Sequence, residues 1–200
     1  GSQFTLSAQF TPPYSLFSKK DYKSLYESSS RADREELYRW IEYYKIKFKS
    51  RVYTPLNNSE KYTLVLMGRA DFGLLGSYNK YKQTPFETFH VGGDGMTGSY
   101  TYATETIGLR GYENGALTPY SDGRAYTRFS MELHFPFLLQ PSSTIYGLAF
   151  VEGGNAWTSL ENFNPFSLKR SAGVGVRIFL PMIGLMGIDW AYGFDKVQGE

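Results

Sequence analysis

Residues 44–56, YKIKFKSRVYTPL, alternate between two kinds of side chain. The even positions carry most of the apolar and aromatic residues: Tyr44, Ile46, Phe48 and Val52. The odd positions carry the cations: Lys45, Lys47, Lys49 and Arg51. Successive side chains of a β-strand point to opposite faces, so this pattern predicts a strand with one apolar face and one charged face.

The same period of two recurs along the chain. It predicts seven strands, at residues 3–12, 43–55, 62–74, 124–136, 144–157, 169–180 and 185–195. Several approach or exceed ten residues, whereas strands of globular proteins have a mode of about 5 to 6 and a tilted membrane strand needs about 9 to 11. Alternation alone leaves open whether the apolar face meets lipid or a protein core.

The connections between these strands alternate in length. The short ones are rich in turn-forming residues and lie at 55–61, 137–143 and 181–184. The long ones lie at 13–42, 75–123 and 158–168. This asymmetry is typical of outer-membrane barrels, which have tight turns on one rim and large loops on the other. We therefore predict an all-β fold, in which residues 1–200 form about seven strands of a larger antiparallel transmembrane β-barrel.

The composition supports strands and argues against several functions. The 17 Tyr, 15 Phe and 21 Gly favour strands and turns. A formal net charge of +2, without a basic tail, gives no reason to expect a nucleic acid as partner. The chain has no cysteine, which rules out disulfides and thiol chemistry. The longest nearly apolar tract, residues 179–188, is far shorter than the roughly 20 residues of a spanning helix.

No motif predicts catalysis, a cofactor or a metal. Residues 93–98 match GxGxxG, but no helix-like segment follows them, so we interpret them as a flexible turn. His90 and His134 lack the spacing of metal ligands. The chain has no GxSxG elbow, and the only serine near His134 on the same face is Ser130, so we expect no enzymatic activity.

One segment could form a helix. Residues 29–44 place Leu37, Trp40 and Ile41 at helical spacing behind Ser30 or Asp33 as a cap. We interpret this segment as a helix within a loop, or as an extension of the following strand.

The connection at residues 75–123 is far longer than ordinary loops, and loops of that length are usually functional or disordered. It contains many large apolar residues: Phe86, Phe89, Val91, Met96, Ile107, Leu109, Tyr112 and Leu117. This content argues against disorder, so we expect the loop to fold into the polar lumen of the barrel. No periodic element accounts for Arg110, which lies between Leu109 and Gly111.

These segments together resemble the BamA family of bacterial outer-membrane assembly factors. The resemblance depends on LRGY at 109–112, PFETFHVGG at 85–93, MELHFPF at 131–137 and FVEGGNAW at 150–157, and TPPYSLF at 11–17 is similar to Bacteroidetes-like members. It covers most of the chain and implies the carboxy-terminal half of the family's barrel. The family tetrad is Val-Arg-Gly-Tyr/Phe in a loop inside the lumen, and here Leu109 replaces the valine.

The resemblance implies roles for the tetrad. Arg110 would pair with carboxylates on the next two strands, where Glu132 and Glu152 stand at the matching positions, and the polar parity of Glu132 agrees with this. A guanidinium keeps its proton and can bind a carboxylate through two hydrogen bonds. Gly111 would permit a tight turn against the wall, and Tyr112 would add apolar area with a polar tip.

The resemblance also implies a function. A BamA-like protein would fold and insert β-barrel proteins into the bacterial outer membrane, with unfolded outer-membrane proteins as clients, accessory subunits as partners and lipid around it. The first and last strands, which form that family's lateral seam, would lie outside this chain. A related TamA-type factor, a two-partner secretion transporter and a passive porin remain alternatives. Inward cations could line an anion-selective pore, but we favour a hydrated wall of ion pairs because the long loop would obstruct conduction.

Overall fold

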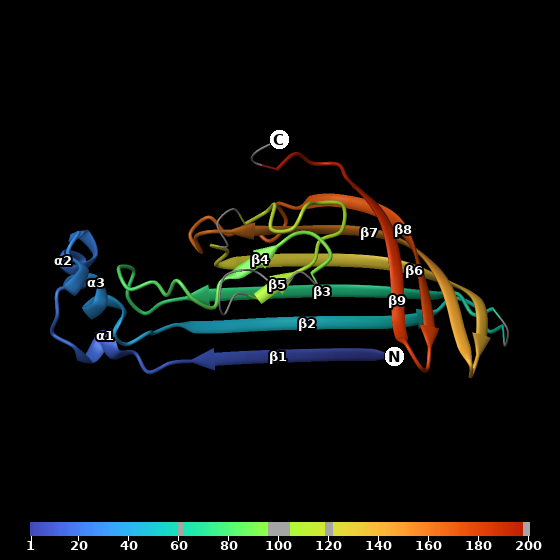
Figure 1. The fold of residues 1–200 in the computed structure, drawn as a ribbon, viewed down its shortest axis with the longest axis horizontal. Helices are drawn as coiled ribbons and strands as arrows, with labels where there is room; N and C mark the ends of the chain where they lie inside the picture. The colour runs from blue at the N-terminus through green and yellow to red at the C-terminus, as the bar shows by residue number, and fades with distance from the viewer. Residues whose placement is uncertain (60–61, 96–104, 119–121, 198–200) are drawn as a thin grey trace.

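Seven long strands form one antiparallel sheet in the computed structural model (Figure 1). The structure describes residues 1–59, 62–95, 105–118 and 122–197. Neighbours in the sheet follow the order β1–β2–β3–β6–β7–β8–β9. The strands are β1 (Ser2–Phe10), β2 (Tyr44–Pro55), β3 (Val65–Gly76), β6 (Ala125–Gln140), β7 (Ser143–Trp157), β8 (Lys169–Leu180) and β9 (Gly184–Gly193). The predicted all-β antiparallel architecture is confirmed, and over the described residues β1 and β9 are the two edges of an open sheet.

The burial of the two faces of the sheet is the reverse of that in a soluble β-sandwich, where the apolar face is buried and the polar face is exposed. Apolar side chains on one face are exposed: Phe4, Leu6, Phe10, Ile46, Val52, Met131, Val151, Val174, Ile188 and Trp190. Polar and charged side chains on the other face are buried: Lys45, Asp71, Arg128, Ser130, Glu152 and Ser171. A large contiguous apolar surface on a folded protein marks contact with a membrane or a partner. The predicted partition between lipid-facing and inward-facing positions agrees with this burial pattern.

Several strand boundaries differ from those predicted. The expected turn at 137–143 belongs mostly to strands, because β6 continues to Gln140 and β7 begins at Ser143. A register shift between Pro136 and Leu138 leaves Phe137 without a cross-strand partner. Proline has no N–H to donate to the ladder and is tolerated at such bulges, so the strand continues past a residue that looked like its end.

Three short helices occupy the connection between β1 and β2. They are α1 (Tyr14–Phe17), α2 (Tyr22–Glu27) and α3 (Arg31–Tyr38). The predicted helix at 29–44 therefore exists as a loop helix, but it ends at Tyr38, and α1 and α2 were not predicted. Among the described residues, no helix is long and apolar enough to cross a membrane.

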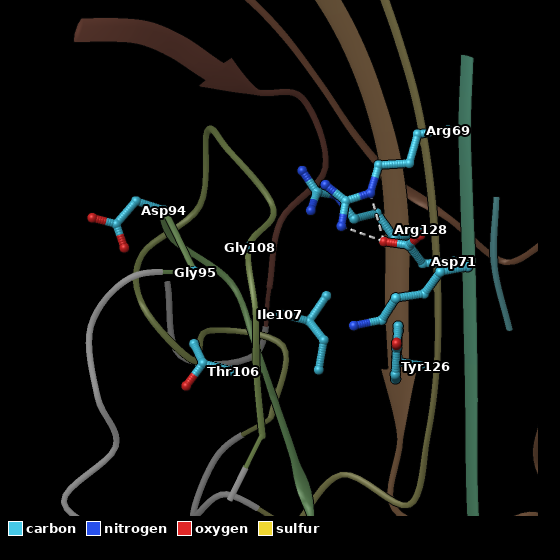
Figure 2. Close-up of a pocket in the computed structure, with 10 residues that line it drawn as sticks. Arg69, Asp71, Asp94, Gly95, Thr106, Ile107, Gly108, Tyr126 and Arg128 are labelled. Atoms are coloured by element: carbon cyan, nitrogen blue, oxygen red, sulfur yellow. Dashed lines mark hydrogen bonds and ion pairs between the residues drawn. The ribbon is translucent and has the colours of Figure 1, made fainter. Parts of the chain in front are cut away.

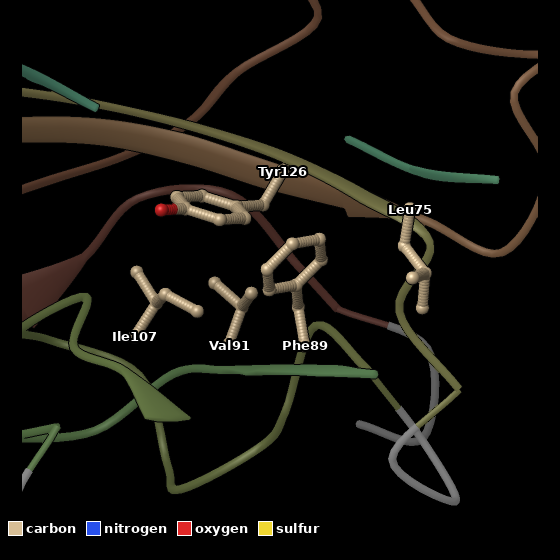
Figure 3. Packing of buried hydrophobic residues seen from close by; sticks show 5 residues of the cluster. All are labelled: Leu75, Phe89, Val91, Ile107 and Tyr126. Atoms are coloured by element: carbon tan, nitrogen blue, oxygen red, sulfur yellow. The ribbon is translucent and has the colours of Figure 1, made fainter. Parts of the chain in front are cut away.

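The connection between β3 and β6, residues 77–124 and hereafter the long loop, packs on the polar face of the sheet. It contains β4 (Phe89–Val91) and β5 (Glu105–Ile107), which pair in parallel and were not predicted. Leu75, Phe89, Val91, Ile107 and Tyr126 form a buried cluster between loop and wall (Figure 3). The rings of Phe89 and Tyr126 meet edge to face at 4.7 Å. Burying each large apolar side chain contributes about 1.5–3 kcal/mol, enough to hold an otherwise irregular segment in place.

Candidate functional site

The tetrad at residues 109–112 is held by the turn that follows β4. Leu109 N–H donates to the Gly93 carbonyl at 2.9 Å, and Gly93 N–H donates to the Tyr112 carbonyl at 3.1 Å. Gly93 has a φ of 71°, in the left-handed region that favours glycine. Leu109 is fully buried, and its methyl groups lie against Gly154 of β7. The apolar residue of the tetrad therefore packs on the wall and leaves Arg110 beside the carboxylates.

Arg110 reaches carboxylates on three strands. Its Nη2 donates to Glu152 Oε1 of β7 at 2.6 Å and also pairs with Glu132 of β6. Its Nη1 donates to Asp189 Oδ2 of β9 at 3.3 Å. Its backbone N–H donates to Glu152 Oε2 at 2.9 Å. Both the main chain and the side chain of Arg110 are thus bonded to the inner wall.

Glu152 is the centre of this group. Besides Arg110, it accepts hydrogen bonds at 2.8 Å from Arg128 Nη2 and from Ser130 Oγ, both on β6. Its side chain has 0% exposure, so its charge depends on these donors rather than on water. We call Arg110, Arg128, Glu132, Glu152 and Asp189 the arginine cluster.

The ring of Phe150 packs against the guanidinium of Arg110. The Cζ atom of Arg110 lies 3.6 Å from the centroid of the Phe150 ring, within the range of a cation–π contact. Phe150 and Glu152 share a parity on β7. Both side chains face the same arginine, one through its ring and one through its carboxylate.

The electrostatics keep Arg110 charged. Burial alone would lower the pKa of Arg110, but the hydrogen bond and negative charge of Glu152, together with Glu132, raise it above its ordinary value. A protonated guanidinium is therefore a permanent feature of the site at any physiological pH.

Gly111 and Tyr112 bring the loop against the last two strands. Gly111 has a φ of 92°, and a Cβ there would lie 2.8 Å from Ser171 Cβ and 3.0 Å from the Gly193 nitrogen. The Tyr112 hydroxyl donates to the Arg170 carbonyl of β8 at 2.6 Å. It also accepts from Asp195 N–H at 3.3 Å. The tetrad therefore contacts β6, β7, β8 and β9.

A second group of charges holds the other side of the long loop. Lys47 Nζ donates to Glu105 Oε2 at 2.8 Å, and Lys49 Nζ lies 3.5 Å from Glu105 Oε1. Lys45, whose side chain is only 3% exposed, pairs with Glu87 at 3.1 Å and with Glu105 at 3.4 Å. We call these three lysines of β2 and the two loop carboxylates the lysine cluster. The predicted inward cations thus pair with acidic residues of the loop as well as with those of the wall.

A polar cavity of about 200 Å³ lies between the long loop and the wall (Figure 2). Arg69, Asp71 and Arg128 line it from the wall, while Asp94, Gly95 and residues 106–108 line it from the loop. Arg69 pairs with Asp71 at 2.6 Å. The loop therefore covers a polar, ion-paired part of the wall rather than sealing against it throughout.

The structure brings all six predicted site residues together: Leu109, Arg110, Gly111, Tyr112, Glu132 and Glu152. Sequence reasoning placed Asp189, Arg128 and Ser130 on the inward face but did not connect them with Arg110 or Glu152. It also missed Glu87 and Glu105, because their loop carried no period. Of the predicted turn at 93–98, residues 96–98 lie outside the described residues. Ser130 donates to Glu152 and His134 contacts Glu132 at 2.9 Å, so these two do not form a nucleophile–base pair.

The exposed apolar face, the polar face and the anchored loop together define the wall of an outer-membrane β-barrel with a loop on its inner side. The model of the Omp85 superfamily domain matches residues 4–200, so the chain belongs to the Omp85 superfamily.

A solved structure has the same fold. It is the crystal structure of BamA from Haemophilus ducreyi lacking POTRA domains 1–3, with a TM-score of 0.58 and 21% sequence identity. The match covers 78% of this chain and 32% of that chain. The chain therefore spans about a third of the solved relative, and at this identity the likeness concerns the fold.

Proposed function

We propose that this chain forms the inner wall and the anchored long loop of an insertase that folds β-barrel proteins into the bacterial outer membrane. The observation that carries the proposal is Arg110, which binds carboxylates on β6, β7 and β9. In this proposal the arginine cluster binds the long loop to the wall. The wall therefore stays rigid while a client strand pairs with the edge of the barrel. Unfolded outer-membrane proteins would be the clients, accessory subunits would assist, and no cofactor is required.

The energetic argument concerns burial. An exposed ion pair contributes about 0–1 kcal/mol, whereas removing one partner of a desolvated pair costs about 3–5 kcal/mol. The side chains of Arg110 and Glu152 are 12% and 0% exposed. Loss of Arg110 would leave the Glu152 charge buried with fewer hydrogen-bond donors, so the long loop would be bound less tightly to the wall.

The test compares Arg110→Ala and Arg110→Lys with Arg31→Ala in the full-length protein. Arg31 is a matched control because its side chain is 93% exposed and its ion pair is with Glu35 of the same helix. We expect Arg110→Ala to expose the long loop to protease and to lower the yield of a folded client barrel in proteoliposomes. Lysine should restore part of both, since it keeps the charge but not the forked geometry. Equal client assembly by Arg110→Ala and Arg31→Ala would overturn the proposal.

Two other activities make different predictions for the same preparation. A two-partner secretion transporter would deliver its client through the membrane into the opposite compartment instead of leaving it in the bilayer. A passive porin would give large, stable open currents in a planar bilayer. The pairing of Lys45, Lys47 and Lys49 with loop carboxylates weighs against an anion-selective pore.

A further inference from the structure

The segment between β1 and β2, which contains the three helices, exposes large apolar side chains at the rim of the sheet. Leu16 is 68% exposed, Phe17 83% and Trp40 56%. The helices lie beyond the ends of β1 and β2 (Figure 1), on the rim from which the long loop also emerges. In barrels of this kind the long loops lie on the extracellular side.

Specific contacts hold these helices in place. Ser15 donates to Glu42 through its N–H at 2.8 Å and through its Oγ at 2.5 Å, and Glu42 is 1% exposed. The rings of Tyr14 and Trp40 lie 5.5 Å apart. The segment is therefore an ordered part of the fold, and its exposed residues have defined positions.

The long loop covers another part of the helices. Lys82 lies over the Tyr22 ring at 5.0 Å, and the rings of Tyr26 and Tyr81 are 6.0 Å apart. Tyr22 and Lys82 are both buried, and so is Leu37 of α3. These contacts leave Leu16, Phe17 and Trp40 uncovered.

The uncovered residues lie next to the exposed apolar residues of β1 along the chain. Phe4, Leu6 and Phe10 of β1 are 63%, 73% and 66% exposed. The pairing of β1 with β2 extends past Phe10, because Thr11 N–H donates to the Tyr43 carbonyl at 3.0 Å. Leu16 and Phe17 follow within a few residues, and Trp40 lies a few residues before Tyr43.

The length of β2, which has chain on both sides, sets the depth of these residues. A strand of 12 residues rises about 3.3 Å per residue, and tilted by roughly 40° it spans about 30 Å, enough to cross an apolar band of about 25 Å. Phe10 pairs with Tyr44 at the start of β2, so it lies at the headgroup boundary, and α1 follows it directly along the chain. Trp and Tyr favour this boundary because their rings are apolar and their tips are polar.

We propose that α1–α3 form a membrane-interface anchor, in which Leu16, Phe17 and Trp40 lie in the headgroup–acyl boundary of the outer leaflet. The anchor would fix the height and tilt of β1 and β2 in the bilayer and would seat the start of the long loop through Tyr22 and Tyr26. This inference depends on the barrel crossing the membrane, but not on the insertase activity.

The experiment measures depth with a fluorophore. The chain has no cysteine, so Phe17→Cys, Leu6→Cys and Arg31→Cys each introduce one labelling site within it. The full-length protein, labelled with an environment-sensitive dye, is reconstituted in phosphatidylcholine vesicles. Nitroxide lipids carry the quencher either near the headgroup end of the acyl chain or near its methyl end.

We expect the dye at position 17 to lose fluorescence to the shallow quencher and much less to the deep one. Position 6 should respond to acyl-chain quenchers as a lipid-facing strand residue, and position 31 should respond to neither. Two results would overturn the proposal: quenching at 17 no stronger than at 31, or a water-shielded emission at 17 without lipid quenching, which would show that protein covers the surface. Failure of quenching at position 6 would contradict the barrel itself, so the two failures are distinguishable.

Discussion

Arg110 connects three strands through a single side chain, and its partners differ in burial. Glu152 is fully buried and accepts from Arg110, Arg128 and Ser130. Asp189 is 21% exposed and already pairs with Arg177 at 2.6 Å. Since the cost of losing a charge partner grows with desolvation, the two carboxylates should contribute very differently.

Glu152→Gln should therefore destabilise the protein by about 3–5 kcal/mol, because two buried cations lose their charge partner. Asp189→Asn should cost about 1 kcal/mol or less, since water screens that position. Urea unfolding in detergent micelles measures both. Equal effects of the two substitutions would contradict the central place of Glu152.

The backbone conformation at position 111 requires glycine. Its φ of 92° and the 2.8 Å approach of a Cβ to Ser171 mean that alanine would meet both backbone strain and a clash. We expect Gly111→Ala to destabilise the loop by about 1–3 kcal/mol. Gly68→Ala is the control, because a Cβ at Gly68 meets nothing within 4 Å. The unfolding temperature and the rate of protease cleavage of the long loop should change for Gly111→Ala but not for Gly68→Ala.

At the scale of elements, β2 holds the long loop through the lysine cluster. Burial alone would raise the pKa of Glu105, but the hydrogen bond from Lys47 and the charges of Lys45 and Lys49 lower it below its ordinary value of 4.5. A carboxyl whose pKa is lower in the folded state stabilises the fold above its unfolded pKa. That stabilisation is lost as the pH falls through the folded value.

Glu105→Gln should thus reduce the unfolding free energy at pH 7, and its difference from the wild type should shrink below about pH 4.5. The measurement is paired urea unfolding of both proteins across this range. A difference that stays constant with pH would show that Glu105 acts through packing rather than charge.

The sequence predicted elements unequally well, for a physical reason. The seven long strands repeat their pattern over 9 to 16 residues, so the period of two is plain. Helices of 4 and 6 residues are too short to show a period. Pairs such as Ser15 with Glu42 hold them, and no local signal encodes that contact. β4 and β5 are 3 residues each, and their parallel pairing exists only because the loop packs on the wall.

At the scale of the whole molecule, the exposed apolar face is the surface that we expect to contact the hydrocarbon of the membrane. Val174 lies in the middle of β8 on this face and is 54% exposed. In a bilayer, Val174→Arg should cost about 2–4 kcal/mol, the penalty for a cation at mid-depth on a barrel surface.

The control is Ser142→Arg in the turn between β6 and β7, which should change stability little because that rim meets water. Equilibrium unfolding of both variants in lipid vesicles gives the comparison. A similar, small effect of the two substitutions would mean that the apolar face of β8 does not contact hydrocarbon.

The sequence by itself determined the strands, their two faces and the position of the tetrad, because alternation is a local property that each strand carries in its own residues. Only the tertiary structure decided which charges meet. Asp189 joins Arg110 because β9 curves beside the loop, and Glu105 joins Lys47 because β5 crosses above β2. Such contacts depend on the path of a long loop across the sheet, and that path is set by packing against Tyr126 and Leu75 rather than by any period in the loop.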